Sequence, residues 1–288
     1  MPSTFIPGRC PALTALLFAG PFGCAASTVR GGYCAPPAVA FDAYAPEPPP
    51  ADTAPHEAQV AALVGLGGVT AQEVSQSTAT RLRVVERLEL ASVAIGATSA
   101  ELDCERERAE EAADFLARGQ ADSVQALTIG SIAAAALTGI VGVFLSTTGA
   151  SPVAQDSTAI AGGAATAGLG LASLYVRQKT TFDHPRNLLA DVWLGPRTSA
   201  TYPPVIWTYF TRPVFSNTRT SPIREKIVER WKHFREVDDR ATAAILFGNG
   251  GSYDVESLRL RSAMLGEVKA EVELTRQELA ALAASLLR

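Results

Sequence analysis

The three histidines are the side chains best suited to proton transfer near neutral pH, and they are far apart in the sequence. His56, His184 and His233 lie in three segments of different composition, without the spacing of a zinc site or a catalytic pair. No GxSxG, Walker or GxGxxG motif occurs, and GLGG at 65–68 lacks the spacing of a phosphate loop. We therefore expect no catalytic residue, no metal and no cofactor.

The segment HPRN (184–187) is the one place where acid–base chemistry could gather, because Asp183 and Asp191 stand close to it in the sequence. A turn and a short helix explain the same residues, with Asp183 near the helix start and Pro185 as its first residue. The turn is the commoner use of such residues, so we interpret the segment as structural.

The N-terminal segment contains a cysteine, Cys24, that could be lipidated after export. In residues 1–26, Arg9 precedes an uncharged run that ends in small residues, the pattern of a secretory signal peptide. Gly23-Cys24 resembles the end of a bacterial lipobox and predicts lipidation of Cys24, although Pro21 and Phe22 depart from that motif. Cleavage after Ala25 or Ala26 by an ordinary signal peptidase is the alternative.

The number of cysteines agrees better with lipidation. Cys10 would leave with the signal and Cys24 would carry lipid, so Cys34 and Cys104 would remain as a pair that can form a disulfide outside the cytoplasm. Cys104 could equally be a small buried residue of a helix.

Composition limits the fold and the partners. The 288 residues are 47% hydrophobic and 19% charged, and the net charge is −4. A nucleic-acid-binding protein needs a basic surface, so we expect no nucleic-acid partner. Only 7% of the residues are aromatic, and Ala, Leu, Val and Gly carry the apolar content. The composition favours a mainly α fold with little or no β structure.

The elements around these residues follow from periodicity. Residues 27–60 are Pro-rich and predict a disordered tether, and 70–122 predict one long amphipathic helix. Residues 181–220 form an irregular region rich in Pro and aromatic residues, and 222–288 predict two amphipathic helices. The last helix has apolar residues at every seventh position, namely Leu258, Leu265, Val272, Leu279 and Leu286. We expect a helical bundle with long, coiled-coil-like helices.

Residues 123–177 differ from the rest because Asp156 is the only charge between Ser123 and Val176. The stretch Ala126–Leu145 is about as long as the hydrocarbon core of a bilayer is thick, and the turn at 146–152 separates it from a second apolar helix. The region predicts an apolar helical hairpin embedded in a membrane. A buried helix pair in a soluble domain is the alternative.

Small residues recur every fourth position in both helices of this hairpin. They are Gly130, Ala134, Thr138 and Gly142 in the first helix and Gly162, Thr166 and Gly170 in the second. Such faces let helices approach closely in lipid. The region resembles the glycine-zipper hairpins of bacterial membrane and envelope proteins, a resemblance that implies helix packing and self-association through these residues.

Topology leaves three interpretations open. With an exported N-terminus, the loop 146–157 would face the cytoplasm, yet it has no Lys or Arg, whereas Arg177 and Lys179 follow the second helix. This conflicts with the positive-inside rule. Either the N-terminal segment is not a cleaved signal, or the hairpin passes the inner membrane and inserts later, or it is the core of a soluble domain.

We therefore expect a non-enzymatic protein of the bacterial cell envelope, lipid-anchored or embedded in the membrane, with a structural or assembly role. The alternative is a soluble periplasmic helical protein that binds a partner or ligand through the aromatic segment 181–215.

Lipidation predicts a change in processing. Replacing the thiol by a hydroxyl in Cys24→Ser should abolish incorporation of radiolabelled fatty acid and shift the mass of the mature protein, because only the thiol can accept the lipid. Mass spectrometry of the processed chain measures this. An unchanged mature mass would remove the lipoprotein hypothesis and leave export intact.

Overall fold

The computed structural model describes residues 28–29, 34, 51, 53–234, 237 and 240–288. The predicted signal segment 1–26 lies outside the described residues, as does most of the predicted tether 27–60. The described chain is mainly α, which confirms the predicted fold class. Its elements are β1 (Thr28–Val29), α1 (His56–Leu63), α2 (Ala71–Gln76), α3 (Thr78–Thr147), α4 (Pro152–Leu174), β2 (Thr180–Asp183), α5 (Leu188–Leu194), α6 (Pro204–Thr211), the 3-10 turn η2 (Pro213–Phe215), α7 (Ile223–Phe234), α8 (Arg240–Phe247), β3 (Gly250–Tyr253) and α9 (Val255–Leu286).

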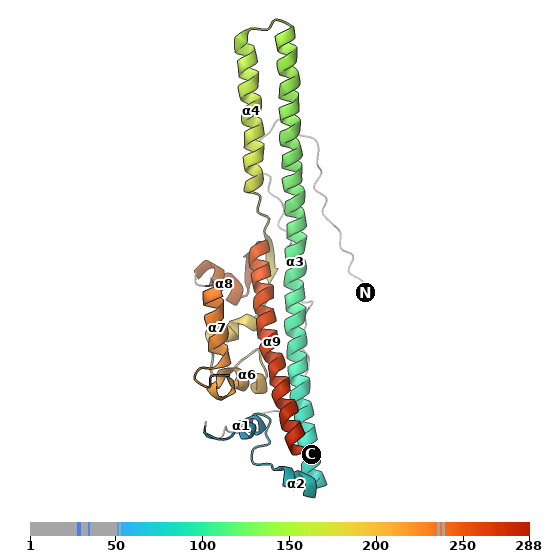
Figure 1. The fold of residues 1–288 in the computed structure, drawn as a ribbon, viewed down its shortest axis with the longest axis vertical. Helices are drawn as coiled ribbons and strands as arrows, with labels where there is room; N and C mark the ends of the chain where they lie inside the picture. Colours follow the sequence, from blue (N-terminus) through green and yellow to red (C-terminus); the bar gives the residue numbers. More distant parts are fainter. Residues whose placement is uncertain (1–27, 30–33, 35–50, 52, 235–236, 238–239) are drawn as a thin grey trace.

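The helix α3 runs the length of the molecule (Figure 1). It has 70 residues and would therefore be about 105 Å long at 1.5 Å per residue. Its sequence contains no proline, and its N-cap is Ser77, whose hydroxyl accepts a hydrogen bond from the backbone N–H of Thr80. The long amphipathic segment and the first apolar segment of the sequence are thus one continuous helix, while the predicted start at residue 70 belongs to the short helix α2.

The polar half of α3 packs antiparallel against α9 through a heptad seam (Figure 1). The ion pairs Lys269–Asp103 (3.0 Å) and Arg259–Asp114 (3.5 Å) fix the register at two heights. All five seventh-position residues of α9 named above are buried, as are the members of its second column, Arg261, Val268, Thr275 and Leu282.

On α3 the seam consists of two columns of residues, each spaced seven apart, that face α9. The first column is Leu88, Ile95, Leu102, Ala109 and Leu116, which recur at every seventh residue and pack in the core. The second column is Val84, Ala91, Thr98, Glu105 and Ala112, all buried. At the start of α3 two valines are adjacent, and the structure buries Val84 while Val85 is 47% exposed.

A small three-stranded sheet and short helices cover one side of the α3–α9 pair. β2 is central, with β1 parallel on one side and β3 antiparallel on the other. Residues 222–288 contain α7, α8, β3 and α9, one helix and one strand more than the two helices that the sequence indicated. The N-cap of α9 is Asp254, which forms a reciprocal capping box with Ser257.

A buried polar cluster joins the sheet to both long helices. Arg261 of α9 is fully buried and donates to the side-chain oxygen of Asn187 (3.2 Å) and to the carbonyl of Leu246 (3.1 Å). Arg108 of α3 donates to Glu105 (2.7 Å) and to the carbonyl of Asp183 (3.0 Å). Two arginines from facing helices thereby hold the strand β2 and the loop before α5 in place.

His184 is buried in this cluster as a neutral ring. The hydroxyl of Tyr253 donates to the carbonyl of Ile245 (2.8 Å), so Nε2 of His184 is the donor in its own 2.8 Å hydrogen bond to that hydroxyl. Burial, together with the nearby charges of Arg261 and Arg108, lowers the pKa of His184 to about 3.

Stability should consequently fall when the pH falls from about 6.5 towards 3. In that range the unfolded chain binds a proton at residue 184 and the folded chain does not, which costs the fold about 3 kcal/mol at pH 4. In His184→Gln, whose amide can still donate to Tyr253, the difference in unfolding free energy between pH 7 and pH 4 should shrink by about that amount. Urea unfolding followed by circular dichroism measures it.

The matched control is His233→Gln, since His233 is exposed. It should keep the pH dependence of the wild type. Equal pH dependence in wild type and His184→Gln would contradict the neutral, buried state of His184.

Candidate membrane-spanning hairpin

The last part of α3 and all of α4 form a helical hairpin that projects beyond the rest of the molecule (Figure 1). Gly149 takes a left-handed conformation in the turn, with φ of +72°. Ser151 caps α4 by accepting from the backbone N–H of Ala154, and Pro152 is the first helical residue. These residues reverse the chain within four positions and place the two apolar helices side by side.

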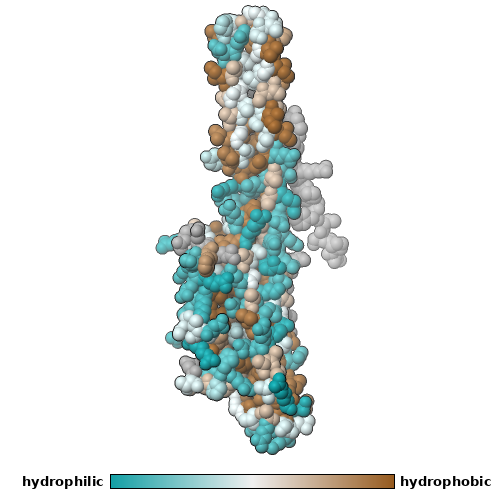
Figure 2. Space-filling view, viewed as in Figure 1, coloured by the Kyte–Doolittle hydropathy of each residue, from teal (hydrophilic) through white to brown (hydrophobic). Residues whose placement is uncertain are grey.

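The hairpin carries its apolar side chains on the outside (Figure 2). In α3 and in α4, windows of 18 residues reach a mean hydropathy of 2.0 and 1.2, and no residue of either window is buried. Large exposed side chains are Ile129, Ile132, Leu137, Ile140, Val143, Phe144, Val153, Ile160, Leu171 and Leu174. Both helices are therefore long and apolar enough to cross a membrane, and the described residues cover neither of the two apolar windows.

The hydroxyl groups of the hairpin are hydrogen-bonded within their own helices. Each donates to a backbone carbonyl three or four residues earlier, as Thr138 does to Ala134 (2.8 Å) and Thr166 does to Gly162 (2.9 Å). The same holds for Thr128, Ser131, Ser146, Ser157, Thr158 and Ser173. Such internal pairing is what a polar side chain needs in hydrocarbon, where no water can replace it.

The small residues divide into two groups. Gly162 lies against the side chain of Thr138, and a Cβ at Gly130 would be 3.8 Å from Leu169, so these glycines face the partner helix of the hairpin. A Cβ at Gly142 or at Gly170 would meet no atom within 4 Å. Within one chain, Gly142 and Gly170 therefore line open surface.

The end of the hairpin nearest the bundle has the residues of a membrane interface. Leu174 and Tyr175 are 75% and 81% exposed, and Tyr is enriched where lipid meets water. Arg177 and Lys179, both exposed, follow directly. The apolar surface therefore ends where the cations begin.

The two described cysteines, Cys34 and Cys104, lie on the bundle side of this boundary. Cys34 and Cys104 form a disulfide with a Cα–Cα distance of 5.7 Å, which connects the N-terminal segment to α3. Cys24 lies outside the described residues.

The HPRN segment is structural, but not for the reason that the sequence indicated. Asp183 ends β2, and Asn187 caps α5 by accepting from the backbone N–H of Leu189 (3.1 Å), so the prediction that Asp183 and Pro185 open a helix is wrong. Arg186 pairs with Glu101 of α3 (2.7 Å).

The aromatic residues of 181–215 lie mostly in the core. Tyr202, Trp207, Tyr209, Phe210 and Phe215 are each at most 5% exposed. Prolines in this region start α6 and η2, in agreement with the short helices and turns that the sequence favours. The segment therefore offers little aromatic surface for a ligand.

Sequence reasoning missed the two buried arginines, Arg108 and Arg261, and the buried ring of His184 near them. The available signal was Arg261, a charged residue in an apolar heptad column, where a buried partner is required. In the described part of the chain, no group of three or more His, Cys, Asp or Glu side chains could hold a metal ion.

Comparisons with protein family models, with curated proteins and with solved structures find no match to this chain.

A charge in the middle of the hairpin should distinguish lipid from water around it. Leu137 is 63% exposed near the centre of the first apolar helix. Leu137→Arg should therefore make the free energy of membrane insertion about 2.5 to 3.5 kcal/mol less favourable. We expect a smaller membrane-bound fraction after carbonate extraction. Leu82→Arg is the control, because Leu82 is equally exposed at 65% on the bundle half of α3. Identical fractionation of both variants would place the hairpin in water.

Proposed function

We propose that this chain is a non-enzymatic, membrane-embedded protein of the bacterial cell envelope with a structural or assembly role. The observation that carries the proposal is the apolar hairpin, whose exposed surface nothing else in the described chain covers. Soluble monomers rarely expose an apolar surface of this extent, and a bilayer is the solvent that suits it.

A structural role agrees with the use of the reactive side chains. His184, Arg186 and Asn187 are engaged in contacts between β2, α3, α5 and α9, and Arg108 and Arg261 connect the two long helices to that layer. These groups hold the bundle together rather than face a substrate.

The disulfide supports an exported bundle. Disulfides persist outside the reducing cytoplasm, so Cys34 and Cys104 favour a bundle that lies on the periplasmic side of the membrane. The turn from Thr148 to Ser151 would then lie on the opposite face. This is the arrangement that conflicts with the positive-inside rule, because Arg177 and Lys179 then lie on the exported side. The conflict is mild, because the turn is short and has no charge.

Self-association through the outward glycines is the assembly step that we propose. Gly142 and Gly170 leave room for a second helix at close distance, whereas Gly162 already contacts Thr138 of its own chain. The two kinds of glycine can be separated by mutation.

Gly142→Leu combined with Gly170→Leu should keep the hairpin intact and remain in the membrane, because both side chains enter open space. The double variant should lose self-association, since a leucine side chain prevents the helix backbones of two chains from approaching closely. Oligomer size in detergent and the membrane-bound fraction measure both properties.

Gly162→Leu is the comparison within the hairpin. Its side chain overlaps Thr138, and overpacking of this kind lowers stability by about 1 to 3 kcal/mol. A double variant that matches the wild type in oligomer size would show that the outward glycines have no role in assembly.

A further inference from the structure

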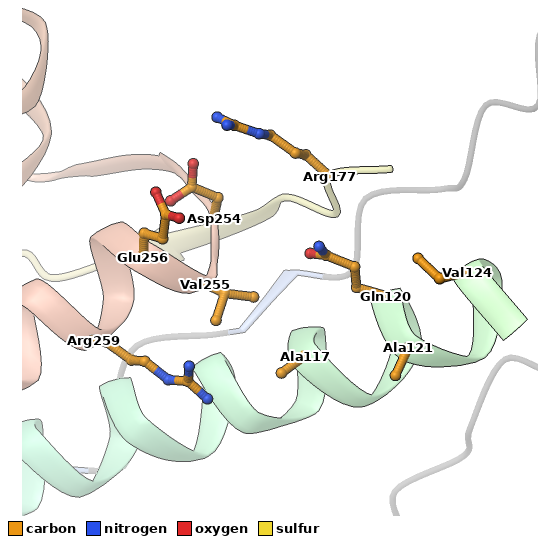
Figure 3. A pocket seen from close by; sticks show the side chains of 9 residues that line it. All are labelled: Ala117, Gln120, Ala121, Val124, Arg177, Asp254, Val255, Glu256 and Arg259. Atoms are coloured by element: carbon orange, nitrogen blue, oxygen red, sulfur yellow. The ribbon is translucent and has the colours of Figure 1, made fainter. Parts of the chain in front are cut away.

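A cleft lies at the base of the hairpin, between α3 and the start of α9 (Figure 3). Its volume is about 400 Å³. Ala117, Ala121 and Val124 of α3 and Val255 of α9 give it an apolar wall. The polar wall contains Arg177, Asp254, Glu256 and Arg259, two positive and two negative side chains.

The position of the cleft matches the headgroup layer of a bilayer that surrounds the hairpin. Val124 precedes the apolar stretch by two residues, and Arg177 follows Leu174 by three. Ala117, the α3 residue of the cleft that is farthest from the stretch, is about 13 Å along the helix from Ala126. The headgroup region begins at the edge of the hydrocarbon and is several ångströms deep. The end of the cleft at Val124 and Arg177 therefore lies where phosphates and ammonium groups of lipids would be found, and the end at Ala117 extends beyond that layer.

The charged side chains of the cleft differ in how far they are already neutralised. Arg259 pairs with Asp114 (3.5 Å), and Asp254 accepts the hydrogen bonds that cap α9. Among the described residues, Arg177 and Glu256 form no salt bridge. Figure 3 shows Arg177 extending over the carboxylates of Asp254 and Glu256. One cation and one carboxylate at the rim are thus available to a ligand.

Asp254 remains ionised beside them. Burial would raise its pKa, but the hydrogen bonds from Ser257 and the charges of Lys179 and Arg177 outweigh burial, and the pKa is lowered. The rim therefore keeps both signs of charge at neutral pH. A purely anionic headgroup would meet two carboxylates, and a simple cation would meet Arg177.

We propose that this cleft binds the headgroup of a phospholipid that carries a phosphate and a primary ammonium group. The guanidinium of Arg177 would donate to the phosphate, and Glu256 would accept from the ammonium. The acyl chains would follow the apolar surface of the hairpin from Val124 towards Ile129 and Leu174. This assignment rests on the proposed insertion of the hairpin in a bilayer.

Native mass spectrometry of the full chain in detergent tests the assignment with three probes that share the same acyl chains: phosphatidylethanolamine, phosphatidylcholine and phosphatidylglycerol. We expect phosphatidylethanolamine to be retained about fivefold more than either of the other two lipids. A factor of this size corresponds to the upper end of the binding energy that one exposed ion pair contributes. Arg177→Gln should weaken the retention of all three lipids. Glu256→Gln should remove only the preference for the primary ammonium group.

Controls come from the other end of α9. Arg276 and Glu273 form an exposed ion pair (3.4 Å) far from the cleft, so Arg276→Gln and Glu273→Gln should retain lipid as the wild type does. Inorganic phosphate at equal concentration is the competitor: displacement of the lipid by phosphate alone would identify a simple anion site and overturn the proposal. Equal retention of the three lipids, or a preference unchanged in Glu256→Gln, would overturn it as well.

Flotation with vesicles of phosphatidylethanolamine and phosphatidylglycerol separates this proposal from the function on which it rests. A chain that does not float contradicts membrane insertion and, with it, the headgroup site. A chain that floats but shows no headgroup preference contradicts only the site.

Discussion

The molecule depends on one constraint, the continuity of α3 through two different surroundings. Its first part packs against α9 through a heptad seam, and its last part packs against α4 through glycine and threonine. No proline interrupts it between Thr78 and Thr147. Because nearly every other described element contacts α3 or α9, the orientation of the hairpin relative to the bundle follows from the register of this single helix.

The polar layer of the seam makes that register specific. Arg108 and Glu105 on α3 and Arg261 on α9 are buried among apolar residues, and their hydrogen bonds extend to Asp183, Asn187 and Leu246. A shift of α9 by one heptad would move Arg261 away from Asn187 and leave a buried charge without its acceptors. An unpaired buried charge costs several kcal/mol of folding free energy. That cost is larger than the difference in free energy between two registers that pair only apolar residues.

Much of this fold can be predicted from the sequence, and the failures have physical causes. The seam of α9 is readable because leucine and valine occupy five successive heptads. The second column of α3 cannot be recognised in this way, because Ala91 and Ala112 are small and Thr98 and Glu105 are polar. Strands β2 and β3 have four residues each, too few for an alternating pattern. The charged cleft was also missed, since it forms only when residues 117–124, 177 and 254–259 meet across the bundle.

The rigidity of α3 has a mechanical consequence. From Thr78 to Val124 the helix rises about 70 Å, so the end that carries α2 and the C-terminus would stand that far from the edge of the hydrocarbon. Membrane helices commonly tilt by about 20° from the bilayer normal, and a tilt of this size would carry the distant end about 24 Å sideways. The helix would act as a lever arm, converting a small reorientation within the bilayer into a large displacement at the far end.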